Sequence, residues 1–373
     1  MKEGWEYRQF ESCLVKVPKQ VQVKSKDYKK KGKFPIVSQE AELISGYWDD
    51  ETIVYKPKEP VVIFGDHTKI IKYVDFDFVV GADGTHILRT KNDIYSKFFY
   101  YVLKSIKLRQ LGYARHYKLL KEKFIPVPPL SEQQSIVDYL DSAFAKIDAM
   151  KANAEKALNE AKALFQASLK EMLEPKEGWE EMKFGKICEF VRGPFGGSLK
   201  KECFRDSGYA VYEQQNAIYN KFTFRYFIDD EKYKSLIRFK VNPGDLIMSC
   251  SGTIGKVAII PEDCEEGVIN QALLKLTPKN KIDAHFLKYL MESNYFGEII
   301  NANIEGVAIK NIASVAVLKE IILSIPTVSV QQSIVETLDS LKSKVGKLQE
   351  NYDKISQECD ALKQALLREV FEG

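Results

Sequence analysis

Residues 133–142, QQSIVDYLDS, recur at residues 331–340 as QQSIVETLDS, with 8 of 10 positions identical at an offset of 198 residues. The same offset relates residues 163–174, ALFQASLKEMLE, to residues 361–372, ALKQALLREVFE, with 7 of 12 positions identical. Self-similarity at one fixed offset indicates that a structural unit occurs twice in the chain. We therefore expect a pseudo-twofold tandem repeat.

The segments between these similar flanks have diverged. KEGWE at residues 2–6 recurs at residues 176–180 with an offset of 174, so the middle of the second copy is 24 residues longer than that of the first. Different central segments between similar flanks predict two domains that have different binding specificities and share one scaffold. The expected division is a first domain at 1–130, a helix at 131–174, a second domain at 175–328 and a second helix at 329–373.

The flanks have the heptad pattern of a coiled coil, because apolar residues alternate in steps of four and three. In the second copy the seam is Ile334, Leu338, Leu341, Val345, Leu348, Tyr352, Ile355, Cys359, Leu362 and Leu366. Subtracting the offset gives the expected seam of the first copy: Ile136, Leu140, Ala143, Ile147, Met150, Ala154, Ala157, Ala161, Leu164 and Ser168. We expect large side chains of one helix to pack against alanines of the other.

Capping signals predict where these helices begin and end. Ser131 is followed three residues later by Gln134, and Ser329 by Gln332, each a capping-box pattern. Pro175 then ends the first helix.

Between the flanks the pattern is mixed α/β. Short β-branched or aromatic runs bounded by Gly, Pro and Asp predict strands. Helical periodicity is found near residues 97–111 and 283–300. The clearest predicted strands are 61–64, 77–80, 245–248 and 256–260. The expected fold class is α/β (α+β), with two β-rich domains and two long helices.

Composition excludes several classes of protein. The chain has 373 residues, of which 45% are hydrophobic and 29% charged, so it is neither disordered nor membrane-embedded. It has no uninterrupted run of 18 apolar residues and no apolar segment at its start, which predicts a cytoplasmic protein without membrane contact. Its six cysteines form no Cys-x-x-Cys pair, so we expect buried thiols.

Charge is distributed unevenly along the chain. The two helical flanks together carry a net charge of −5, so the rest of the chain carries +8. Residues 16–33 contain eight lysines and one acid, and residues 97–123 contain eight Lys or Arg and one acid. Such clusters suit a polyanion such as nucleic acid, although solvated surface is an equal alternative.

Sequence signatures of enzymes are missing. The sequence has no phosphate-binding Gly-x-x-x-x-Gly-Lys-Ser/Thr loop, its four histidines are scattered, and Glu181-x-Lys183 lacks the Pro-Asp partner of a metal nuclease. No nucleophile and base stand at a recognisable spacing. We expect a binding protein with no catalytic residue, metal or cofactor.

Polar residues at the expected loop tips are suited to reading bases, since amides and hydroxyls address base edges and cations hold phosphates. Each taken singly is also an ordinary surface residue. In the first copy the candidates are Lys31, Ser38, Gln39, His67, Thr68, Lys69, Arg115, His116 and Lys118. In the second copy they are Arg192, Lys200, Gln214, Gln215, Asn216, Ser251, Thr253, Lys256, Asn270, Gln271 and Lys310.

With these residues assembled, the whole chain resembles the specificity subunit of type I restriction-modification systems. Together the motifs are specific. They are KFPIVSQ at 33–39, GDHT at 65–68, GADG at 81–84, RHY at 115–117, IPVPPLSEQQ from Ile125, PGDLIM at 243–248, SGT at 251–253 and INQ at 269–271.

The resemblance implies a DNA-recognition protein without chemistry of its own. Each domain would read one half of a bipartite target in double-stranded DNA, and the two helices would form an antiparallel coiled coil that fixes the spacing. The implied partners are two methyltransferase subunits and an ATP-powered restriction subunit.

Repeated polar residues at the helix starts, which we expect to be exposed, are candidates for holding those partners, because they are the same in both copies while the domains differ. Capping and solvation are an equal alternative. The candidates are Gln133, Gln134, Asp141, Gln331, Gln332 and Asp339. The competing reading of the whole chain is a coiled-coil scaffold with two protein-binding modules, and a self-sufficient nuclease or methyltransferase comes third.

Overall fold

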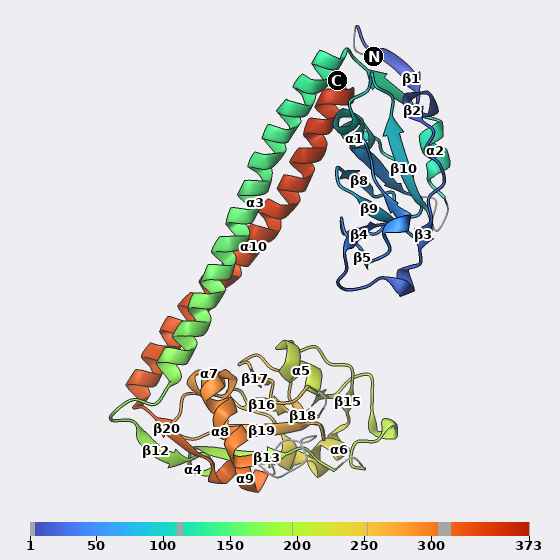
Figure 1. Cartoon of the computed structure of the whole chain (residues 1–373). Coiled ribbons are helices and arrows are strands. Elements are labelled where there is room, and N and C mark those ends of the chain that lie inside the picture. Colours follow the sequence, from blue (N-terminus) through green and yellow to red (C-terminus); the bar gives the residue numbers. More distant parts are fainter. Residues whose placement is uncertain (1–3, 110–114, 196, 252, 305–314, 373) are drawn as a thin grey trace. The chain divides into compact units, whose positions relative to one another are not determined.

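The computed structural model describes residues 4–109, 115–195, 197–251, 253–304 and 315–372 (Figure 1). It divides into two compact units. The first unit is Met1–Lys156 with Asn351–Gly373, and the second is Ala157–Glu350. Both long helices contribute to both units: α3 spans Leu130–Leu173 and α10 spans Val328–Glu372.

The first unit contains three small sheets. β1 (Glu6–Gln9) pairs with β11 (Phe124–Val127). A second sheet has the order β2 (Leu14–Val15), β10 (Thr85–Thr90), β7 (Val61–Gly65), β8 (Ile71–Val74). The third has the order β3 (Gln22–Val23), β9 (Phe78–Gly81), β4 (Phe34–Val37), β5 (Gly46–Trp48), with β6 (Val54–Tyr55) also on β9. The short helices are α1 (Ser96–Ser105) and α2 (Tyr117–Lys121).

The second unit repeats this plan. β12 (Glu180–Lys183) pairs with β20 (Ile322–Ile325). The central sheet has the order β13 (Cys188–Arg192), β19 (Leu273–Pro278), β16 (Leu246–Ser249), β17 (Val257–Ile259). A third sheet has the order β15 (Phe227–Ile228), β14 (Tyr209–Tyr212), β18 (Gly267–Ile269). The helices are α4 (Phe184–Ile187), α5 (Gln214–Tyr219), α6 (Asp230–Ser235), α7 (Ala284–Glu292), α8 (Asn294–Ile304) and α9 (Val315–Glu320).

The predicted strands and the helical region near 283–300 are confirmed, whereas the helix near 97–111 ends at Ser105, and residues 110 and 111 lie outside the described residues. The repeat extends into the diverged middles. The sheet order β2-β10-β7-β8 of the first unit matches β13-β19-β16-β17 of the second, and the parallel pair β4 and β9 matches β14 and β18. The chain is therefore a mixed α/β tandem repeat whose two copies share a topology despite their different sequences.

The two long helices pack antiparallel within each unit. In the first unit, Lys151 Nζ of α3 lies 3.7 Å from Asp360 Oδ1 of α10, and Asp148 Oδ1 of α3 lies 2.5 Å from Lys363 Nζ of α10. Residue numbers therefore rise along α3 in the direction in which they fall along α10. In the second unit Leu169 and Leu173 of α3 share a core with the start of α10. The helix pair is thus a coiled coil that joins the hydrophobic core of each unit.

The predicted seam of α10 is buried or half-buried as far as Cys359, but three of the ten predicted α3 positions are wrong. Met150, Ala157 and Leu164 are exposed, and the neighbouring Leu158 is buried instead. A Leu buries more apolar area than an Ala, so the helix turns to place the larger side chain inside. Leu362 of α10 is also exposed, because the last turns bury Leu367 and Phe371 in the first unit's core.

The predicted capping boxes are also wrong. α3 begins at Leu130 and α10 at Val328, so Ser131 and Ser329 lie inside the first turn. The first intrahelical bonds run from Gln133 N to Pro129 O and from Gln331 N to Thr327 O. Pro129 and Thr327 therefore occupy the N-cap positions.

Candidate nucleic-acid interface

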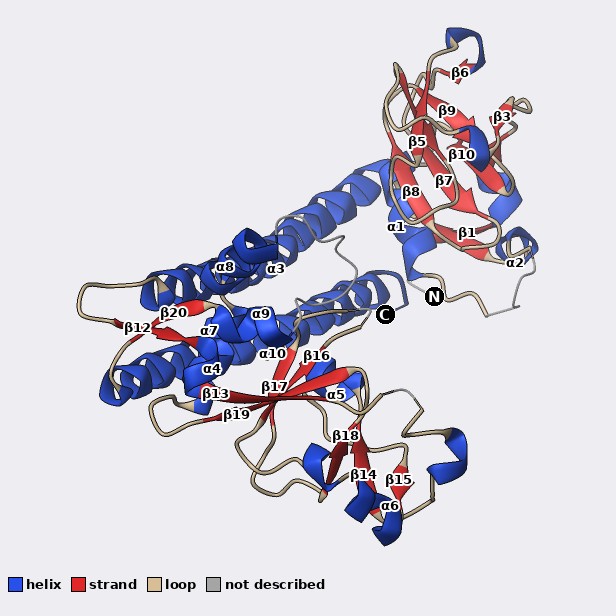
Figure 2. Ribbon diagram, turned by 90° about the horizontal axis from the view of Figure 1, so that it is seen from below, coloured by secondary structure: helices blue, strands red, loops and turns tan. Residues whose placement is uncertain are grey.

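The strand directions of the second unit gather its predicted loops at one sheet edge. β13 and β16 both run antiparallel to β19, with Arg192 opposite Leu274 and Ser249 opposite Leu273. The chain leaving β13, the chain leaving β16 and the chain entering β19 therefore meet at the same edge. Figure 2 shows these strands together with β17 and α5. We call the described residues 192–195, 197–201, 213–216, 250–251, 253–256 and 270–272 the second-unit edge.

The start of α5 joins this edge through the parallel pair β14 and β18. Asn270 N donates to Tyr212 O at 2.9 Å, and α5 packs against β16 and β17. Glu213, just before α5, accepts from two nitrogens of the Arg225 guanidinium, Nε at 3.0 Å and Nη2 at 2.9 Å. Gln214 and Gln215 are thereby presented beside the 270–272 loop.

Close contacts fix the loops of this edge against one another. A Cβ at Gly193 would lie 1.8 Å from Asn270 O, so only glycine permits this approach of the two loops. Ser249 Oγ donates to Thr253 O at 2.6 Å and closes the 250–256 loop. Burial raises the pKa of the Cys250 thiol to about 11, and the Arg192 guanidinium acts in the opposite direction.

Most of the second copy's candidates lie on this edge. Arg192, Lys200, Thr253, Lys256 and Gln271 are exposed there, and Gln214, Gln215, Ser251 and Asn270 are half-buried. Lys310 lies outside the described residues.

Asn216 is the exception, because it is fully buried. Its Oδ1 accepts from Glu213 N at 2.7 Å, and its Nδ2 donates to Lys221 O at 2.7 Å. Its amide is thus used in shaping the start of α5, and the expectation that it faces a ligand is wrong.

The first unit builds an equivalent edge. β7 and β10 are antiparallel, with Gly65 opposite Thr85, and β4 and β9 are parallel, with Val37 opposite Val80. The chain after β4, after β7 and before β10 therefore meets at one place, which we call the first-unit edge (residues 38–45, 66–70, 82–84 and 115–118). Gln39 ties three of these segments together: Nε2 donates to Asp83 O, Oε1 accepts from His67 N, and its carbonyl accepts from Thr68 Oγ1.

A buried carboxylate, Asp66, attaches the 115–117 segment to the first-unit edge. Its Oδ1 accepts from Tyr117 N at 2.7 Å, and its carbonyl accepts from His116 N at 2.8 Å. Its Oδ2 lies 3.4 Å from His86 Nε2 and 4.0 Å from Arg115 Nε. The His86 ring stacks on Tyr117 with centroids 4.1 Å apart. Sequence reasoning missed Asp66, His86 and Tyr117 as a group, although an acid directly after a fully buried strand was a usable signal.

The first copy's candidates divide between the surface and the interior. Thr68, Arg115 and Lys118 are exposed on this edge, and His67 and Lys69 are half-buried. Lys31 is exposed but precedes β4, at the opposite end of that strand, so the structure does not bring it to the edge.

Ser38 and His116 are buried, so the expectation that they contact a ligand is wrong. Ser38 Oγ bonds Ser45 Oγ at 2.7 Å, and His116 Nδ1 lies 3.0 Å from Asp66 O. Both side chains are used in holding the loops in place.

A groove of about 760 Å³ opens on the first-unit edge. One wall is the segment after β2, with Lys16, Lys19 and Gln20, and the other includes His86 and Arg115. Lys16, Lys19 and Arg115 are exposed. Thr85, which also lines the groove, is buried, and its hydroxyl has no hydrogen-bond partner among the described residues. The groove therefore offers cations at its rim and unused hydrogen-bonding capacity inside.

The family model for the type I restriction modification DNA specificity domain matches residues 2–160 and again residues 176–357. The chain belongs to this family. It is a specificity subunit, the non-catalytic DNA-recognition component of a type I restriction-modification system.

Two relatives come from Escherichia coli. The specificity subunit is 23% identical over 334 residues to the type I restriction enzyme EcoBI specificity subunit, covering 77% of this chain and 67% of that protein. It is 29% identical over 190 residues to the EcoR124I/EcoR124II specificity subunit, covering 47% of this chain and 46% of that protein.

Solved structures share the fold. One, from a study of complex assembly and conformational transition of the type I system, has a TM-score of 0.70 at 18% identity and covers 98% of this chain and 97% of its own. The HsdS subunit from Thermoanaerobacter tengcongensis has a TM-score of 0.58 at 18% identity, covering 100% and 97%. Among the described residues of this specificity subunit, no helix is long and apolar enough to cross a bilayer, and no cluster of His, Cys, Asp and Glu has the form of a metal site.

The repeated glutamines at the helix starts of the specificity subunit are not surface residues. Gln133 and Gln331 are fully buried, which corrects the expectation that they are exposed. Gln133 Oε1 accepts from Tyr95 N at 2.8 Å, and its Nε2 donates to the carbonyls of Asp93 and Pro128. Gln331 repeats the pattern with Asp283 N, Lys281 O and Pro326 O. Each glutamine therefore fastens a long helix to its own domain.

Asp141 and Asp339 make a second repeated connection. Asp141 accepts from Tyr101 at 2.5 Å and pairs with Lys97 at 2.6 Å, and Asp339 accepts from Tyr289 at 2.5 Å. Burial, reinforced by the aspartate, raises the pKa of Tyr101, so this phenol remains a donor. Gln134 and Gln332, the neighbours of the buried glutamines, are exposed.

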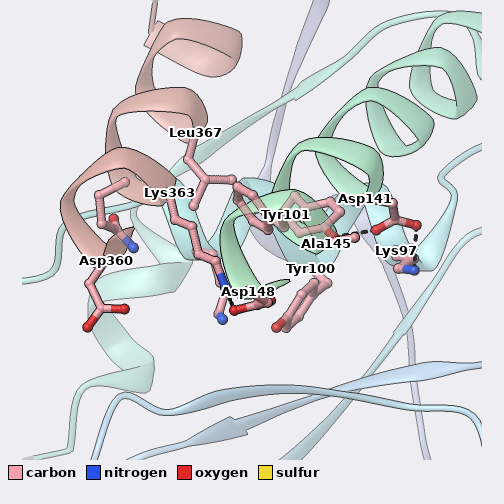
Figure 3. Close-up of a pocket in the computed structure, with 12 residues that line it drawn as sticks. Lys97, Tyr100, Tyr101, Asp141, Ala145, Asp148, Asp360, Lys363 and Leu367 are labelled. Carbon is pink, nitrogen blue, oxygen red and sulfur yellow. Dashed lines mark hydrogen bonds and ion pairs between the residues drawn. The ribbon is translucent and has the colours of Figure 1, made fainter. Parts of the chain in front are cut away.

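Asp141 also borders an open cavity of about 720 Å³ between α1, α3 and α10 in the first unit (Figure 3). Tyr100 and Phe144 line it, and the Lys363 to Asp148 ion pair lies on its α10 side. The cavity thus combines aromatic rings with charged pairs whose groups remain partly accessible.

Replacing Gln331 by Ala should lower the free energy of unfolding of the second unit by about 2–3 kcal/mol, because the buried groups of Lys281, Asp283 and Pro326 lose their partner. Gln332→Ala, one residue further along the same helix, should change it by less than about 0.5 kcal/mol. Urea unfolding of the full chain measures both. Equal effects of the two substitutions would contradict the fastening role of Gln331.

Proposed function

We propose that this specificity subunit reads a bipartite sequence in double-stranded DNA. Residues 1–130 would read one half and residues 175–328 the other, and the helices at 131–174 and 329–373 would set the number of bases between them. The observation that supports this most is the repeated sheet edge: two units of one topology present loops of different polar sequence at the same place. Two domains with the same topology but different exposed polar residues are suited to reading two half-sites of different sequence.

The exposed cations of both edges are proposed as phosphate contacts. In the first unit they are Lys16, Lys19 and Arg115 around the groove, and in the second unit Arg192, Lys200 and Lys256. Phosphate contacts orient a protein on the duplex without reading its sequence.

The accessible amides and hydroxyls that lie between these cations are proposed to read bases. They include Thr68 in the first unit and Gln214, Gln215, Thr253 and Gln271 in the second. Amides are able to bond adenine in the major groove at two points, and hydroxyls accept or donate.

The proposed partners are two methyltransferase subunits and one restriction subunit. Two docking places follow from the repeat, and the exposed Gln134 and Gln332, near the half-exposed Asp141 and the exposed Asp339, are the remaining candidates there. Since the substrate would be chromosomal DNA, we propose the cytoplasm as its compartment.

Salt dependence of DNA binding by the assembled methyltransferase complex tests this proposal. The logarithm of the affinity should fall as the logarithm of the salt concentration rises, and each phosphate contact should make this slope steeper by about 0.9. Lys256→Ala should weaken binding and make the slope shallower by about one such increment. Lys347→Ala, which removes an exposed lysine of α10, should leave the slope unchanged.

Two results would contradict the proposal. Salt-independent association with DNA would favour a protein scaffold, because counterion release would then be absent. Identical slopes for wild type and Lys256→Ala would remove the second-unit edge from the interface.

A further inference from the structure

One aromatic side chain of the second-unit edge stands almost entirely in solvent. Phe195 is 94% exposed, the highest value among the exposed large hydrophobic side chains in the described part of the chain. Folding ordinarily buries a ring of this size. No described residue of the second unit covers the Phe195 ring, so an external partner would account for its position.

Described residues before and after Phe195 are attached to the domain. Gly193 N donates to Leu273 O at 2.9 Å, and Pro194 and Leu199 are buried. Ser198 N donates to Phe195 O at 2.8 Å. The ring is therefore presented from an anchored turn whose base lies against Asn270, a candidate base-reading residue.

The surroundings of the ring are cationic. Residues 192–201, 250–256 and 270–272 contain Arg192, Lys200, Lys201 and Lys256 and no acidic residue, and the one acid of the second-unit edge, Glu213, is paired with Arg225. Ile254, 36% exposed in the neighbouring loop, is a second apolar group on this edge. An apolar projection inside a ring of cations and amides matches a duplex, which has charged phosphates outside and apolar base faces within.

We propose that Phe195 enters the base stack of the half-site read by the second unit and partly unstacks one base step. Arg192 and Lys200 hold the phosphates on either side of that step. The inserted ring favours steps that open easily, such as pyrimidine–purine steps, and so adds sequence selectivity without a hydrogen bond. This inference rests on the proposed function and deepens it.

The experiment uses the specificity subunit assembled with its methyltransferase subunits, on a duplex that carries its methylated motif. 2-Aminopurine is placed at successive positions of the half-site assigned to the second unit. Wild type should raise the fluorescence at one step. Phe195→Ala should abolish this rise and weaken binding roughly tenfold, since stacking of a base on an aromatic ring contributes at about this level.

Two further variants serve as controls. Phe195→Trp should retain the rise, because it keeps an aromatic ring. Phe124→Ala, which removes another exposed phenylalanine at 65% exposure on β11 of the first unit, should leave fluorescence and affinity unchanged.

The inference alone is overturned if the wild-type complex methylates a bipartite motif but Phe195→Ala keeps both the fluorescence and the affinity. It is also overturned if Phe195→Ala prevents assembly with the methyltransferase, because the ring then contacts protein. If the wild-type complex recognises no bipartite motif, the proposed function fails together with the inference.

Discussion

Exchanging residues 175–328 for the corresponding segment of another specificity subunit should change one half of the methylated motif completely and leave the other half and the spacing unaltered. The second-unit edge lies entirely within this segment, and the first-unit edge lies entirely within residues 38–118. The exchange therefore replaces all the proposed base-contacting groups of the second unit and none of those of the first unit. Mapping methylated adenines in cells that express the chimera with the methyltransferase measures the result.

The exchange must preserve the fastening contacts to give this result. Gln331 on α10 binds Asp283 N and Lys281 O, and Asp339 binds Tyr289, so the incoming segment needs matching groups. A control chimera that carries residues 1–130 from the same donor should change the opposite half. A change in both halves from either exchange would show that the units do not read DNA independently.

Lengthening both helices by one heptad should lengthen the spacer of the motif, by up to about three base pairs, and should abolish methylation at the original sites. Seven residues add about 10 Å of helix, and a base pair rises about 3.4 Å. A heptad keeps the seam in phase. Insertions after Lys156 of α3 and after Glu350 of α10, where the two units meet in sequence, leave the described contacts of both units intact.

The matched control for this prediction inserts the heptad into α3 alone. Seven residues then lack partners on α10, so the antiparallel pairing cannot be kept on both sides of the insertion. Methylation should be lost rather than shifted to a longer spacer. An unchanged spacer in the double insertion would show that the helices do not set the distance between half-sites.

The sequence allowed the repeat, the long helices and the main strands to be predicted, because these depend on spacing alone. The heptads of α10 are a periodic signal, and the apolar run at Val61–Gly65 is bounded by Pro60 and Asp66, so neither needs tertiary information. Three positions of the α3 seam were misplaced, since the offset from α10 ignored which of two neighbours, such as Ala157 and Leu158, has more apolar area to bury.

The candidate site could be predicted only in part, because polarity in a sequence does not distinguish a surface group from a buried connection. Gln133 and Gln134 are adjacent and chemically identical, yet one is buried with three hydrogen bonds to its domain and the other is exposed. Asp66, His86 and Tyr117 meet only through the sheet order β10-β7 and the return of the chain to α2. Such groupings arise from topology and leave no spacing in the sequence.

Co-expression of the wild-type chain with its methyltransferase subunit, followed by mapping of methylated adenines across the host genome, tests the central claim most directly. The account predicts one new motif made of two defined halves separated by a constant number of unspecified bases. A stable complex that produces no new methylation, or a motif with a single uninterrupted half, would contradict it.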